Sequence, residues 1–139
     1  MPAHYVGVVH STHVERGKAA GFVAFSHGHE AAVRSLNPGD RVIFYAPKTD
    51  FDGDPVQEFV GHATVTGDAA YLTEYMGGFP AWVRNATFDE VIPVPVRPLI
   101  PQLTFIRDKA HWGMAFRQGK FRIGESDYAL IAGRLLGRT

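Results

Sequence analysis

Segment 105–123, FIRDKAHWGMAFRQGKFRI, concentrates the residue types that bind planar polar ligands. It contains Trp112, three of the chain's ten phenylalanines, and five Lys or Arg residues against one acid, Asp108. Aromatic rings beside cations and glycines can build a flat-walled slot that stacks a planar ring and donates hydrogen bonds to its edge. The alternative interpretation is a buried aromatic cluster with solvated cations around it, because aromatic residues belong more often to a core than to a site.

Two other segments combine aromatic, glycine or cationic residues at places where binding groups tend to lie, in a loop or at the end of a strand. They are Gly21–Phe22 and Tyr45–Lys48, with the sequences GF and YAPK. Together with residues 105–117, these segments form the candidate site.

Motifs for metals, phosphate loops and nucleophiles are absent from the sequence. His10 with His13, and His27 with His29, resemble pairs of metal ligands, but the chain has no cysteine to complete a zinc site. It also lacks the glycine-rich phosphate loops and the G-x-S-x-G motif of serine hydrolases. We therefore expect no metal, no cofactor and no catalysis.

Composition limits the classes of function. The chain has 139 residues, 45% of them hydrophobic, with 14 basic and 14 acidic side chains. A protein that coats duplex nucleic acid needs excess Lys and Arg to release counterions, and this chain has none overall. The sequence has no apolar run near the roughly 20 residues of a membrane helix, and residues 1–12 lack the basic start and long apolar centre of a signal peptide. We expect a cytoplasmic, monomeric protein of one domain, residues 1–139, without a membrane partner.

Hydrophobic patterning predicts six short strands and few helices. The expected strands cover residues 4–10, 41–46, 58–66, 69–76, 82–88 and 120–123, although 69–76 also suits a helix. The expected helices are a short helical turn through residues 15–20 that Ser11 or Thr12 can cap, and residues 29–36 and 125–136. Prolines at 93, 95, 98 and 101 indicate an edge strand or an extended connector. Gly113 and Gly119 argue against one continuous helix over 105–123. The pattern is typical of an α+β fold, a mostly antiparallel β-barrel of about six strands with flanking helices.

Several spaced motifs resemble the EVE domain, a member of the PUA-like superfamily. They are GF followed by HG, PGD followed by YxPK, and FIxDKxxWGxxFRxG, and the resemblance runs from about Tyr5 to Leu136. It implies a PUA-like β-barrel related to YTH domains, which hold a methylated base in an aromatic cage, and to ASCH domains. EVE domains fused to nucleases are associated with recognition of modified cytosine in DNA.

The resemblance implies a ligand pocket at eleven positions of this chain. These are Gly21, Phe22, Tyr45, Pro47, Lys48, Phe105, Ile106, Trp112, Gly113, Phe116 and Arg117. We expect Trp112 to form one wall of the slot, with Arg117 and Lys48 contacting a phosphate or a base edge.

Three hypotheses of function follow. The first is a non-catalytic reader that holds a modified nucleobase, with modified cytosine favoured, in DNA, RNA or a free nucleotide. The second is a small hydrolase of a modified nucleoside. ASCH relatives include hydrolases of acylated cytidine, and Lys48–Thr49 offers a Lys/Thr pair as a candidate for such catalysis. The third is a protein-interaction module in which the aromatic cluster is only core.

Overall fold

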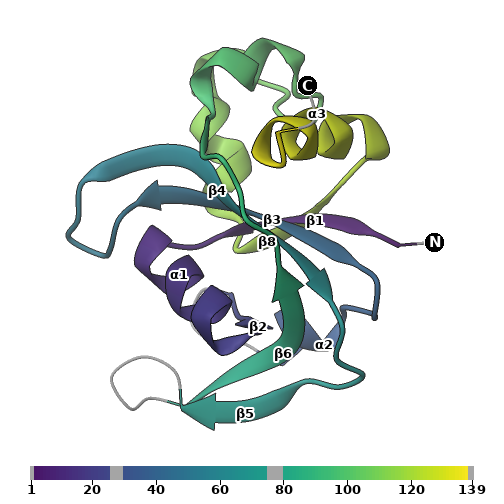
Figure 1. The fold of residues 1–139 in the computed structure, drawn as a ribbon. Helices are drawn as coiled ribbons and strands as arrows, with labels where there is room; N and C mark the ends of the chain where they lie inside the picture. Colours follow the sequence, from purple (N-terminus) through teal and green to yellow (C-terminus); the bar gives the residue numbers. More distant parts are fainter. Residues whose placement is uncertain (1, 26–29, 75–79, 138–139) are drawn as a thin grey trace.

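A curled, mixed β-sheet forms a half-barrel with helices on both sides in the computed structural model, which describes residues 2–25, 30–74 and 80–137 (Figure 1). Its elements are β1 (His4–Val8), α1 (Ser11–Ala20), β2 (Phe22–Val23), α2 (Glu30–Arg34), β3 (Arg41–Lys48), β4 (Pro55–Val65), β5 (Tyr71–Glu74), β6 (Pro80–Phe88), β7 (Val94–Pro95), η2 (Arg97–Gln102), η3 (Lys109–Arg117), β8 (Lys120–Ile123) and α3 (Glu125–Leu135). None of the helices in the described ranges is both long and apolar enough to span a bilayer.

The strand order β2-β6-β4-β3-β1-β8 places β3 and β1 side by side near the middle of the sheet. β1 and β3 run parallel, with Val6 opposite Ile43, whereas every other strand pair in the described residues is antiparallel. A parallel pair needs a long crossover, and the chain supplies it with α1, β2 and α2. The Asp40 carboxylate fixes the start of this pairing by accepting hydrogen bonds from the backbone N–H groups of Ala3 and Asn37, both at 2.9 Å.

The two faces of β3 contribute to two separate cores. Ile43 and Tyr45 pack into a cluster that includes residues of η2, η3 and α3. Val42 and Phe44 pack into a cluster that includes residues of α1 and the region of α2. Because successive side chains of a strand point to opposite faces, one buried strand joins both cores.

The sequence-based expectations for the fold are confirmed in outline. All six expected strands are present, and the described sheet has two further strands of two residues each, β2 and β7. Segment 109–117 is not one regular helix but 3-10 turns joined across non-helical residues His111 and Phe116. α1 includes Ser11 and Thr12, which were expected to cap it, and its N-cap is His10. The expected strand 69–76 is reduced to β5, with residues 75 and 76 outside the described ranges.

The crossover depends on close packing at Gly17 in α1. A Cβ atom at this position would lie 2.7 Å from the backbone carbonyl oxygen of Phe22. We expect Gly17→Ala to lower the free energy of unfolding by about 1–3 kcal/mol, although alanine normally favours a helix by about 1 kcal/mol. Urea denaturation measures the change.

Gly113→Ala is the matched control, because a Cβ atom there would meet no atom within 4 Å. Its free energy of unfolding is expected to stay within about 0.5 kcal/mol of the wild type. A Gly17→Ala protein as stable as the wild type would contradict the close approach of β2 to α1.

Candidate functional site

The larger candidate pocket has a volume of about 550 Å³ and lies between the end of β1, α2 and the segment that leads into β8. Small-molecule sites in proteins commonly measure about 300–1,000 Å³, so the pocket is large enough for a nucleobase with part of its sugar. Its lining residues are Val8, Phe25, Ala31, Ala32, Ser35, Phe116, Arg117, Gln118, Gly119 and Lys120.

The ladder between β1 and β8 positions one wall of this pocket. It pairs Gly7 with Lys120 and continues past the strand end, where the backbone N–H of Val8 donates to the carbonyl of Gly119 at 2.9 Å. Gly7 has no side chain, and a Cβ atom there would lie 2.6 Å from the ring of Phe25. Glycine at this position therefore allows the Phe25 ring to pack against the strand beneath the pocket.

Lys120 connects the β8 wall to the α2 wall. Its Nζ donates to the carbonyl of Ala32 at 2.8 Å and to Oγ of Ser35 at 2.5 Å. The ammonium also lies 4.6 Å from the ring centroid of Tyr5, within the range of a cation–π contact. Burial lowers the pKa of Lys120, and the Asp40 carboxylate partly opposes this effect. Lys120 is therefore a fixed, partly buried polar group of the pocket wall.

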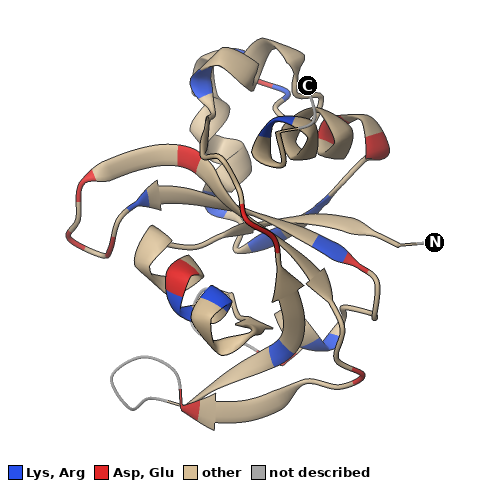
Figure 2. Cartoon of the chain, viewed as in Figure 1, with Lys and Arg blue, Asp and Glu red and all other residues tan. Residues whose placement is uncertain are grey.

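Arg117 is the cation that remains available to a ligand. Its side chain is exposed, and it makes no hydrogen bond or ion pair with any described residue. Figure 2 shows Lys and Arg interspersed with Asp and Glu along the chain rather than gathered in one continuous basic stripe. The pocket thus combines an apolar interior with a small number of polar groups at its rim.

Three of the eleven predicted site residues are buried in the core. Tyr45, Ile106 and Phe116 are 2%, 1% and 7% exposed. The rings of Tyr45 and Phe116 stack with centroids 4.0 Å apart, and Phe59 packs edge-on against Tyr45. Tyr45, Phe59 and Phe116 thus form a buried aromatic cluster, which was the alternative interpretation to a ligand-binding slot.

Trp112 lies at a different and smaller hollow. It lines about 300 Å³ together with Phe105 and Ile106, whereas Arg117 lines the larger pocket. The Trp112 ring meets Phe116 at 76° with centroids 6.1 Å apart, and the Arg97 guanidinium lies 5.3 Å from its centroid. The two aromatic rings are therefore not parallel walls of one slot.

A histidine and a carboxylate border the smaller hollow. Nδ1 of His111 lies 2.9 Å from Oδ2 of Asp108, and the hydrogen bond from His111 lowers the pKa of the Asp108 carboxyl. Nearby, the carboxylate of Asp127 accepts hydrogen bonds from Thr104 and from the backbone N–H of Phe105. α3 thereby fixes the chain that leads into η3.

The remaining predicted residues line neither of these two hollows. Gly21 has a φ of 82° at the end of α1, and Phe22 packs in a small buried cluster with Ala24 and Val83. Pro47 and Lys48 are at the end of β3, and Gly113 is exposed in η3. Of the eleven residues, Phe116 and Arg117 line the larger pocket, and ligand contact by any of them stays a prediction.

Sequence reasoning missed much of the pocket wall. The sequence did not assign to the site the lining residues Val8, Phe25, Ser35 and Lys120. Lys120 nevertheless belongs to the cationic segment 105–123. The pairing of β1 with β8 is what brings them together, and single-sequence patterns do not reveal strand partners. His27 and His29 lie outside the described residues, and no group of three or more metal-ligating side chains is close enough to hold a metal within the described ranges.

Comparisons with known proteins agree with the resemblance drawn from the motifs. The family model described as EVE domain matches residues 4–134. A UPF0310 protein of Mycolicibacterium vanbaalenii is 38% identical, over 98% of this chain and 94% of that protein. A UPF0310 protein of Mycolicibacterium gilvum is 40% identical, over 92% of each chain.

Two solved structures share the fold. The NMR structure of Rpa0253 from Rhodopseudomonas palustris is 17% identical, with a TM-score of 0.60 over 99% of this chain and 95% of that chain. The crystal structure of ASCH from Zymomonas mobilis is 13% identical, with a TM-score of 0.56 over 96% of each chain. At these identities the likeness concerns the PUA-like fold alone.

The buried position of Tyr45 leads to a prediction for alkaline solution. Burial raises the pKa of Tyr45 to about 12, with Arg97 opposing the rise. The folded state therefore holds the phenolic proton more tightly than the unfolded chain, whose tyrosines titrate near pH 10. This contribution to stability is complete below about pH 10 and is lost as the pH rises towards about 12.

Absorbance at 295 nm is expected to show a late ionisation phase that Tyr45→Phe removes. Tyr71→Phe is the control, because Tyr71 is 40% exposed and its loss should leave the late phase in place. A late phase that survives in the Tyr45→Phe protein would contradict this assignment.

Proposed function

The chain belongs to the EVE domain family, and from this premise we propose that it is a non-catalytic domain that holds one modified nucleobase in the larger pocket. Family and fold are consistent with a nucleic-acid-related binding module. Modified cytosine is the favoured base, and the ligand is carried by a single strand of DNA or RNA or by a free nucleotide.

The observation that supports this proposal best is the make-up of the pocket. Val8, Phe25 and Phe116 supply apolar surface, whereas Arg117 and Gln118 supply donors at the rim. A planar heteroaromatic base needs both, since contact with its face contributes about 1–3 kcal/mol and hydrogen bonds to its edge decide which base is accepted. A substituent on the base adds apolar contact within the 550 Å³ available.

Electrostatics favour a single strand over a duplex. Lys120 is already bonded to α2, so Arg117 is the pocket cation that can contact a phosphate or a base edge. A base in a duplex must be flipped out at a cost of a few kcal/mol. With 14 basic and 14 acidic residues, the chain has little surplus charge to offset that cost through phosphate contacts.

The placement of Lys48–Thr49 favours binding over hydrolysis. The Thr49 hydroxyl accepts a hydrogen bond from the backbone N–H of Asp54 at 3.1 Å within the β3–β4 turn. Neither residue lines the larger pocket. The Thr49 hydroxyl is therefore engaged in turn structure, and the pair lies outside the lining of the larger pocket.

Arg117→Ala tests the proposed site. We expect it to weaken binding of a single-stranded oligonucleotide with one modified cytosine about tenfold, through loss of one charged contact. If that contact is to a phosphate, the slope of the logarithm of the binding constant against the logarithm of the salt concentration should also fall in magnitude by about one. Fluorescence anisotropy at two salt concentrations measures both quantities.

Arg122→Ala removes an exposed β8 cation that does not line the pocket and should bind as the wild type does. Trp112→Ala distinguishes the two hollows. Loss of binding in Trp112→Ala with no change in Arg117→Ala would move the site to the smaller hollow. Equally tight binding to an unmodified duplex would contradict the proposed reader.

A further inference from the structure

A second pocket, of about 450 Å³, lies between α3 and the strand sheet and shares no lining residue with the larger pocket. Its polar lining comes from β3, β4, the end of β6 and α3. The polar residues are Arg41, His62, Thr64, Asp89, Glu125 and Tyr128. The α3 side is otherwise made of small residues, including Ala129 and Gly133, which leave space above the strands.

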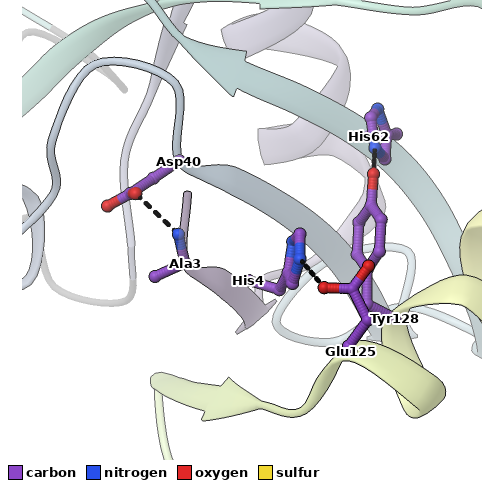
Figure 3. A network of polar contacts seen from close by, with 6 residues as sticks. All are labelled: Ala3, His4, Asp40, His62, Glu125 and Tyr128. Carbon is purple, nitrogen blue, oxygen red and sulfur yellow. Dashed lines mark hydrogen bonds and ion pairs between the residues drawn. The ribbon is translucent and has the colours of Figure 1, made fainter. Parts of the chain in front are cut away.

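A chain of hydrogen bonds forms the floor of this pocket, buried at His62 and Tyr128 and exposed at Asp89. His62, which is 3% exposed, places Nδ1 2.6 Å from Oδ2 of Asp89 and Nε2 2.7 Å from the hydroxyl of Tyr128. Because a carboxylate only accepts, Nδ1 of His62 donates to Asp89, and Nε2 shares a second hydrogen bond with the hydroxyl of Tyr128. Figure 3 shows the hydroxyl of Tyr128 pointing at the ring of His62.

A second histidine contacts the other carboxylate, on the exposed side chain of Glu125. The ring of His4 stacks on that of Tyr128 with centroids 3.9 Å apart, and its Nε2 lies 3.2 Å from Oε2 of Glu125 (Figure 3). Asp89 and Glu125 are therefore each held through one oxygen by a histidine. Their second oxygens, Oδ1 and Oε1, make no hydrogen bond within the part of the chain that the structure describes.

Arg41 adds a cation that has no ionic partner among the described residues. Its guanidinium lies 5.6 Å from the ring centroid of Tyr128 and makes no hydrogen bond or ion pair to any described side chain. The planar fork of an arginine matches a carboxylate with two parallel hydrogen bonds. The pocket thus offers one such fork, two carboxylate oxygens and the hydroxyl of Thr64.

We propose that this pocket binds the head group of an α-amino acid. Arg41 receives the carboxylate, while Asp89, Glu125 and Thr64 accept the three N–H bonds of the ammonium. A simple amine would meet the unpaired charge of Arg41, and a simple anion would meet two carboxylates, so the set favours a ligand with both charges. The proposal does not depend on nucleobase binding.

The volume leaves room beyond the head group, along the small residues of α3. A free amino acid and a larger metabolite with the same head group share this chemistry. Affinity that does not change with the length of the side chain identifies the free amino acid. Affinity that rises with side-chain length identifies the larger metabolite.

The experiment is an NMR titration of the isotope-labelled protein with each protein amino acid in turn, up to about 10 mM, tenfold above a weak Kd of about 1 mM. We expect at least one to cause saturable shifts at Thr64, Ala129 and Gly133. The matching decarboxylated amine and deaminated acid should bind about tenfold more weakly or worse.

Arg41→Gln and Asp89→Asn should each weaken binding of the amino acid about tenfold. Arg122→Gln and Asp68→Asn make the same chemical changes at exposed positions outside the pocket and should bind as the wild type does. Spectra of the free variants verify that they are folded.

The proposal is overturned if no amino acid causes saturable shifts in the wild type. It is also overturned if the amine, the acid and the zwitterion bind equally, or if the shifts map to the larger pocket. A negative result for amino-acid binding would not contradict nucleobase binding at the larger pocket, because the two pockets have separate linings.

Discussion

Burial of β3 on both faces is the constraint on which the other elements depend. Residues 42–46 of this strand are at most 2% exposed, so apolar elements must cover each face of the sheet. α3 with η2 and η3 packs on one face, and α1 and the region of α2 pack on the other. The parallel alignment of β1 with β3 requires the crossover that brings α2 next to the end of β1. The larger pocket forms at that junction, with Lys120 bonded across it.

Sequence patterns predicted the elements better than their partners. The apolar runs of β1 and β3 and the amphipathic pattern of α3 indicated the correct local structure. The glycines of segment 105–123 correctly indicated that it is not one helix, although residues 109–117 depart from helical geometry at His111 and Phe116 rather than at Gly113. The parallel pairing of β1 and β3 was not predictable, because a buried strand has the same pattern in either orientation. The fold itself was indicated by the spaced motifs that resemble the EVE domain.

The site was less predictable, because residue type does not reveal which face of an element is buried. Phe116 and Arg117 are neighbours in sequence, yet one is 7% exposed in the core and the other is exposed at the pocket rim. Tyr45 lies in the fully buried part of β3, where its ring can only pack against other rings. Lys120 acquires its place through a strand partner more than a hundred residues away in the chain.

The two larger pockets differ in the chemistry that they offer, because they are built on different elements. The pocket beside α2 is apolar inside and has cations at its wall, whereas the pocket beside α3 combines one cation with two carboxylates. Neither carries a charge pattern suited to coating a duplex. Both suit small ligands that are recognised by a few directed contacts.

The most direct measurement of the central claim is a set of intermolecular nuclear Overhauser effects from a saturating single-stranded oligonucleotide with one modified cytosine. The account predicts contacts from the protons of that base to the methyl groups of Val8 and the ring of Phe25, which line the larger pocket. Contacts confined to Trp112 and Met114 at the smaller hollow, or none at either pocket when binding is saturated, would contradict it.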